Sequence, residues 1–103
     1  MAPPILTPEQ RAAALEKAAR ARRARAEMKE LLKTGSISFP GLLERAGEDE
    51  LIDGMKVYAA LSAMPRTGKI KAKRMMEELG IAENRRIRGL GERQRSALLN
   101  EFS

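Results

Sequence analysis

The chain has 103 residues, enough for one small domain with a modest hydrophobic core. It contains neither cysteine nor histidine, so disulfides, zinc fingers, Cys or His nucleophiles and imidazole acid–base catalysis are excluded. Its formal net charge of +6 favours a polyanionic partner such as DNA, RNA or an acidic membrane surface.

A long helix is predicted over residues 8–33. Thr7 and Gln10 have the spacing of an N-terminal capping box, with Pro8 at the first helical position. The apolar face is strong only near the helix end, at Met28, Leu31 and Leu32, so we expect the helix to be anchored mainly by its C-terminal third. Helical spacing places five basic residues on one narrow face: Arg11, Arg22, Arg25, Lys29 and Lys33.

Three short helices are predicted over residues 36–64. Ser38 should cap the first of them, which we expect to end at Gly47. Residues 48–50 are acidic and begin the second helix. Negative side chains are favoured at the positive N-terminal end of the helix dipole, which explains these residues better than a metal site or an acid–base site does. The third covers residues 55–64 and stops at Pro65. Because no segment alternates with period two, the predicted fold class is all-α.

Residues 64–81 predict a hairpin of two helices. Thr67 is the expected N-cap of the second helix, and Gly68 lets the backbone come close to a bulky anion. The first N–H groups of this helix, together with Lys69 and Lys73 one turn apart, suit a phosphate. A proline and glycine turn between helices is also a common structural device, so the hairpin alone leaves both interpretations open.

A second turn, over residues 83–91, precedes a final helix that we expect from residue 92 to about 101. Its arginines Arg85, Arg86 and Arg88 outnumber nearby acids, which favours an anion site, although arginine runs are often solvated or locally paired. Tyr58 and two phenylalanines are the only aromatic residues, so no platform for stacking single-stranded bases is visible. Duplex recognition through the backbone is therefore favoured.

Charge is unevenly distributed along these predicted elements. Residues 1–34 carry a net charge of +4, residues 35–62 carry −3 and residues 63–103 carry +5. We therefore expect two basic patches separated by an acidic middle. No apolar run approaches membrane-spanning length and no signal-peptide pattern is present, so we expect a cytoplasmic protein.

The hairpin spacing resembles the helix-hairpin-helix and helix-two-turn-helix hairpins, which grip the DNA backbone without reading bases and usually have glycine where Arg66 stands. The whole chain resembles the actinobacterial integration host factor family of nucleoid-associated proteins. Four stretches carry this resemblance: residues 6–19, residues 55–57 with Leu61, Pro65 with Gly68, Lys69 and Lys71, and residues 85–91.

This resemblance implies a long N-terminal helix (residues 1–35) on a small helical body (residues 36–103), together forming a single DNA-binding domain without enzymatic activity, cofactor or metal. It implies largely sequence-independent duplex binding in the nucleoid, DNA condensation, global regulation and a nucleoprotein complex with a phage integrase. We expect a monomer in solution. A structured RNA or the ribosome is the alternative partner, because small-subunit ribosomal proteins use a similar hairpin, and a membrane-surface role for residues 8–33 is less favoured.

Carried over by position, the resemblance implies DNA contacts at Gly68 and Lys69 of the hairpin and at the three arginines of the second turn. Neighbouring residues complete the expected DNA-binding set, and the basic face of the first helix is a candidate second DNA surface. The expected set is Arg66, Thr67, Gly68, Lys69, Lys71, Lys73, Arg85, Arg86, Arg88 and Gly89, and the second surface is Arg11, Arg22, Arg25, Lys29 and Lys33.

Overall fold

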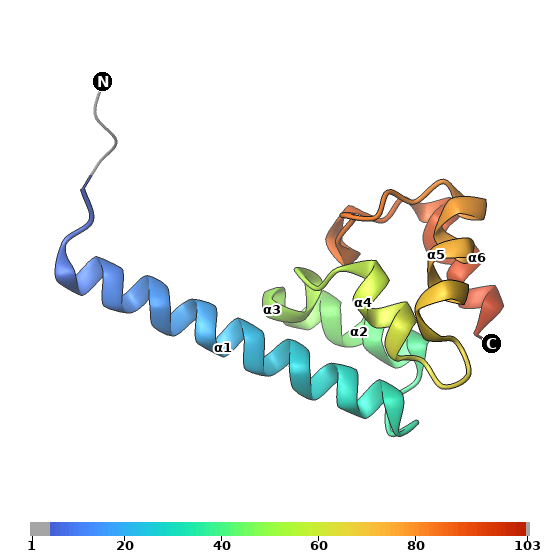
Figure 1. Cartoon of the computed structure of the whole chain (residues 1–103), viewed down its shortest axis with the longest axis horizontal. Coiled ribbons are helices and arrows are strands. Elements are labelled where there is room, and N and C mark those ends of the chain that lie inside the picture. Colours follow the sequence, from blue (N-terminus) through green and yellow to red (C-terminus); the bar gives the residue numbers. More distant parts are fainter. Residues whose placement is uncertain (1–4, 103) are drawn as a thin grey trace.

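The computed structural model describes residues 5–102, and these form six α-helices and one short 3₁₀ helix (Figure 1). In chain order the elements are α1 (Pro8–Lys33), α2 (Phe39–Glu48), α3 (Glu50–Asp53), α4 (Val57–Ala63), α5 (Gly68–Leu79), η1 (Ile87–Gly89) and α6 (Glu92–Glu101). Extended pairing within the described residues is confined to an isolated antiparallel bridge between Lys56 and Arg86. The predicted all-α fold is confirmed.

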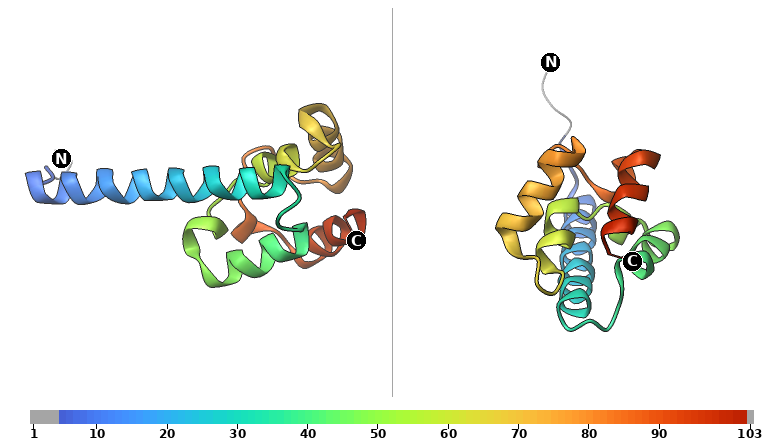
Figure 2. Two further views of the ribbon diagram at one scale, coloured as in Figure 1. Left: turned by 90° about the horizontal axis from the view of Figure 1, so that it is seen from below. Right: turned by 90° about the vertical axis from the view of Figure 1, so that its right-hand side faces the viewer.

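Helix α1 begins and ends where the sequence predicts. Thr7 accepts a hydrogen bond from the backbone N–H of Gln10, and the Gln10 side chain accepts one from the backbone N–H of Thr7, which completes the capping box. Its large buried residues, Met28 and Leu32, lie in the last two turns, while the small Ala21 is buried near the middle. The N-terminal half therefore extends away from the body, as Figures 1 and 2 show.

Two boundaries in the middle of the chain differ from the prediction. Helix α2 continues through Gly47 to Glu48, and Asp49 then starts α3 by accepting a hydrogen bond from the Leu51 N–H at 2.9 Å. The prediction that α2 ends at Gly47 was therefore wrong, because the N-cap of the next helix is Asp49, two residues later. Helix α4 begins at Val57 rather than at residue 55, because the Met55 carbonyl accepts from the Ile87 N–H at 2.9 Å.

The core lies where the short helices meet the C-terminal half of α1. Its largest fully buried side chains come from every part of the body, and Phe39 packs on Phe102 with ring centroids 5.0 Å apart. No polar or charged side chain among residues 5–102 is buried, so every described charge is at the surface. The largest fully buried side chains are Phe39, Leu32, Leu42, Met55, Leu61, Met76, Ile87, Leu98 and Val57.

Helices α4 and α5 form the predicted hairpin. Met64 is the C-cap of α4, directly before Pro65, and Gly80 ends α5 in the left-handed conformation at φ 68°. Viewed end-on, α4 and α5 lie on one side of α1, and α2 and α6 lie on the other (Figure 2). Within the described part of the chain, no helix is both long and apolar enough to cross a membrane.

Candidate nucleic-acid interface

The hairpin turn leaves the start of α5 without a side-chain cap. Thr67 occupies the predicted N-cap position, but its ψ of −66° is far from the extended conformation that a capping threonine uses, and it makes no cap hydrogen bond. It is flanked by Arg66 and Gly68, which both adopt left-handed conformations at φ 66° and 70°. The first N–H groups of α5 are therefore available to an external acceptor such as a phosphate oxygen.

The three lysines near this turn do not share one face of α5. Lys69 and Lys73 are exposed and one turn apart, whereas Lys71 lies roughly 200° around the helix from Lys69. The Lys73 ammonium lies 3.2 Å from the Glu83 carboxylate, and this hydrogen bond raises the pKa of Lys73 above its usual value. Lys69 and Lys73 therefore lie on one side of the hairpin, and Lys71 points away from them.

The second turn, residues 83–91, which we call the arginine turn, is held in place by its own side chains. Arg85 donates to the Gly89 carbonyl at 2.7 Å, and Arg86 donates to the carbonyl of the buried Gly54. Both side chains are half-buried, and Arg88 is exposed. Two of the three predicted arginines thus have structural partners, and Arg88 is the most accessible of the three.

The arginine turn is also fixed to the hairpin. The Val57 N–H at the start of α4 donates to the Arg85 carbonyl at 3.0 Å, next to the bridge between Lys56 and Arg86. The ion pair of Lys73 and Glu83 joins α5 to the beginning of the same turn. The two parts of the predicted site are therefore held in a fixed relation by backbone and side-chain contacts.

Four hollows adjoin these basic residues. The largest, about 680 Å³, lies between α1, α4 and the hairpin turn and brings Lys29 and Lys33 of α1 together with Arg66 and Lys69. A small hollow of about 180 Å³ is lined by Arg25, Lys29, Lys56 and Arg86. A second, of about 400 Å³, is lined by Lys17, Arg25 and Arg88 beside Glu50. A third, also of about 400 Å³, is lined by Lys56, Tyr58, Lys73 and Glu83. The sequence analysis did not identify Lys17, Lys56 or Tyr58 as residues of the candidate interface. For residues 55–57, the family resemblance was the only signal.

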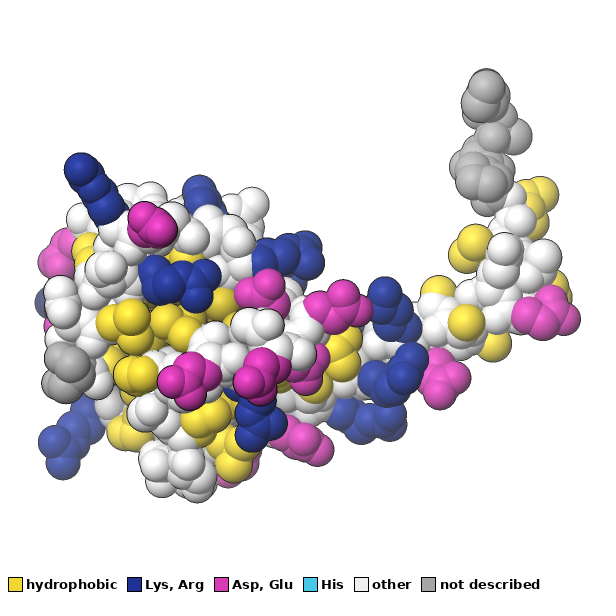
Figure 3. All heavy atoms as spheres, turned by 180° about the vertical axis from the view of Figure 1, so that it is seen from behind, with side chains coloured by type: hydrophobic (Ala, Val, Ile, Leu, Met, Phe, Trp, Pro, Cys, Tyr) yellow, Lys and Arg dark blue, Asp and Glu magenta, His cyan; other side chains and the backbone are white. Residues whose placement is uncertain are grey.

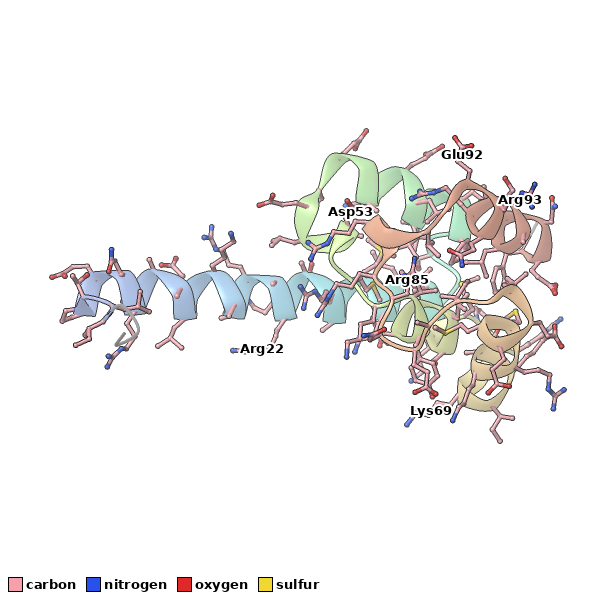
Figure 4. The ribbon with its side chains drawn as sticks, turned by 90° about the horizontal axis from the view of Figure 1, so that it is seen from above. Arg22, Asp53, Lys69, Arg85, Glu92 and Arg93 are labelled. Atoms are coloured by element: carbon pink, nitrogen blue, oxygen red, sulfur yellow. The ribbon has the colours of Figure 1, made fainter. Side chains whose placement is uncertain are left out.

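Charged side chains of different elements point to opposite sides of the molecule. Arg22 and Lys69 point to one side, whereas Asp53, Glu92 and Arg93 lie toward the other (Figure 4). The view from behind shows acidic, basic and hydrophobic side chains together over the body (Figure 3). Asp53 of the acidic middle segment thus lies on the side of the molecule away from Lys69 of the hairpin. Among residues 5–102 no group of three or more Asp or Glu side chains is arranged to hold a metal ion.

Comparisons with known proteins match both the fold and the full length of the chain. Residues 32–102 match the S13-like H2TH domain family. The chain is 59% identical to integration host factor of Mycobacterium tuberculosis (strain H37Rv) over 99% of its own length and 97% of the relative's. It is 54% identical to integration host factor of Streptomyces coelicolor, covering 99% and 95%.

A solved structure of sIHF bound to an 8-base-pair palindromic DNA has the same fold. It superposes with a TM-score of 0.81 at 48% sequence identity, covering 85% of this chain and 99% of that one. The likeness therefore extends over most of the chain and is not confined to the hairpin.

Proposed function

The chain belongs to the actinobacterial integration host factor family, and from that membership we propose that it is a non-enzymatic architectural protein that binds duplex DNA in the nucleoid. The complex of sIHF with DNA supports duplex DNA as the partner and disfavours the RNA alternative. We extend the proposal to the roles that the family resemblance implies, which are DNA condensation, global regulation and phage integration beside an integrase.

The observation that carries this proposal is the uncapped start of α5. Its free N–H groups, the adjacent Lys69 and the arginine turn tied to the same hairpin supply donors and positive charge for phosphates. Such contacts go to the DNA backbone, which is the same in every sequence. We therefore propose binding with little sequence preference, through Arg66, Gly68, Lys69, Lys73 and the arginines of the second turn.

Salt dependence tests the proposal directly. If about four to six phosphates are neutralised, log K for duplexes of unrelated sequence should fall with log salt at a slope of about −4 to −5. Fluorescence anisotropy of labelled duplexes over a range of salt concentrations measures that slope. Binding that ignores salt, or that is confined to one sequence, would contradict the proposal.

A matched pair of variants locates the contact surface in the same titration. Lys69→Ala should weaken binding to all duplexes and make the slope shallower by about 1, because one phosphate contact is lost. Lys71→Ala removes the same charge two residues away but on the opposite side of α5, so it should have little effect. Unlabelled structured RNA serves as competitor at equal salt, and preferential displacement by RNA would favour the alternative function.

A further inference from the structure

We propose that the C-terminal part of α1 and the hairpin are two walls of one DNA-binding groove, and not two separate DNA surfaces. This inference rests on the proposed duplex-binding function and extends it to residues of α1. Lys29 and Lys33 form one wall, and Arg66 and Lys69 form the other, across a hollow of about 680 Å³. We call this hollow the α1–hairpin groove.

The floor of the α1–hairpin groove suits close approach by a nucleic-acid backbone. It is formed by α4, whose residues there are mostly small: Ala59, Ser62 and Ala63, beside the half-buried Tyr58. Small side chains leave room between the two cationic walls, and a tyrosine hydroxyl can donate a hydrogen bond to a phosphate oxygen. The groove therefore combines positive walls with an open floor, as a phosphate backbone requires.

The groove continues toward the arginine turn. Lys29 and Ala59 line it and also line the neighbouring hollow that contains Arg25, Lys56 and Arg86. From Lys33 to Arg25 the helix rises by about 12 Å, which is the length of between three and four base pairs at about 3.4 Å each. One DNA backbone lying along α1 can thus pass both the hairpin and the arginine turn.

Arg22 extends the same wall toward the free end of α1. It shares the helical face of Lys29 and Lys33 and points to the same side of the molecule as Lys69 (Figure 4). The basic face predicted from the sequence as a second surface is therefore the face that α1 turns toward the hairpin side. This geometry is what a single continuous contact surface needs.

One carboxylate opposes this assignment and provides a test. Glu30 lies among the residues that line the groove, where its negative charge repels a phosphate backbone. Replacing it with glutamine keeps the size of the side chain and removes the charge. Glu30→Gln should therefore bind duplex DNA severalfold more tightly at low salt, a gain that damage to the fold cannot produce.

The main test is the double variant Lys29→Ala, Lys33→Ala, titrated with an 8-base-pair duplex that is long enough for only one contact surface. The slope of log K against log salt should become shallower by about 2, because two phosphate contacts are lost. Both lysines are exposed and alanine is a good helix former, so α1 should remain folded.

A matched control removes the same charge from other faces of the same helix. Arg20 and Arg23 are exposed and lie roughly 120–180° around α1 from Lys29, so the double variant Arg20→Ala, Arg23→Ala should keep the wild-type slope. Equal losses in the two double variants would mean a general charge effect and would overturn the inference. Unchanged binding in the Lys29, Lys33 variant would also overturn it and would leave α1 as a separate surface.

The failure of the proposed function would look different, because wild-type protein would then not bind duplex DNA at all. The emission of Tyr58, which lines the groove and also the hollow that holds Lys73, can be followed alone, since the chain has one tyrosine and no tryptophan. A bound duplex should protect the emission of Tyr58 from acrylamide quenching. Unchanged quenching at saturating DNA would show that the groove stays empty and would overturn the inference.

Discussion

At the scale of single residues, the least expected feature is the conformation of Arg66. Its φ of 66° is left-handed, a conformation that costs an L-residue roughly 1–2 kcal/mol and that glycine adopts freely. Gly68, two residues later, has nearly the same φ at no such cost. The chain thus retains a strained arginine at the rim of the groove, where its positive charge faces the proposed path of the DNA.

Arg66→Gly should separate the stability of the turn from its charge. Relief of the left-handed strain, reduced by the larger unfolded-state entropy of glycine, should raise the free energy of unfolding by about 1 kcal/mol. The same change should weaken duplex binding and reduce the salt slope by about 1, because a cation is lost. Urea unfolding and anisotropy measure the two effects. A variant that is less stable than wild type would contradict the assigned strain.

At the scale of elements, local sequence signals predicted the helices well where a cap decides the boundary. The capping box at Thr7 and the N-cap at Ser38 both stand where their residue types suggested. The predicted end of α2 at Gly47 was wrong, because the N-cap at Asp49 sets the boundary between α2 and α3. The sequence analysis also did not predict the α1–hairpin groove. The groove depends on how α1 packs against α4, which spacing along the chain does not encode.

The arginine turn allows structure and binding to be separated by two neighbouring substitutions. Arg86→Ala removes the donor to the carbonyl of the buried Gly54, so the free energy of unfolding should fall by about 1.5–3 kcal/mol. Arg88→Ala affects an exposed side chain, so stability should change by less than about 0.5 kcal/mol while DNA affinity falls.

Thermal and urea unfolding of both variants, beside anisotropy titrations, test this division. If Arg88→Ala unfolds as easily as Arg86→Ala, then Arg88 has a structural role that the geometry does not give it. If Arg88→Ala binds duplex DNA like wild type, the arginine turn contacts DNA through its other residues alone.

At the scale of the whole molecule, charge and shape are organised around α1. Its C-terminal half contributes Met28 and Leu32 to the core and Lys29 and Lys33 to the groove, on different faces of the same turns. Its N-terminal half extends beyond the body, and none of residues 5–20 is buried (Figure 1). Stability and the proposed groove therefore both depend on the part of α1 after residue 20.

Deleting residues 1–13 should test that division without changing net charge, because the segment contains Arg11 but also Glu9. No described residue in it is buried, so the free energy of unfolding should change by less than about 0.5 kcal/mol, whereas Leu32→Ala should cost about 2–5 kcal/mol. Urea unfolding measures both changes. DNA affinity, in contrast, should fall only for duplexes long enough to reach the deleted part of α1.

That length dependence follows from the distance between the free end of α1 and the hairpin. Arg11 lies about 33 Å along the helix from Lys33, close to the length of about ten base pairs, so an 8-base-pair duplex seated at the hairpin does not reach it. The deletion should leave binding of that duplex unchanged and make the salt slope shallower by about 1 on a duplex of about 20 base pairs, because the Arg11 contact is lost. Equal weakening on both lengths would mean that the free half of α1 supports the body and does not act as an extension of the groove.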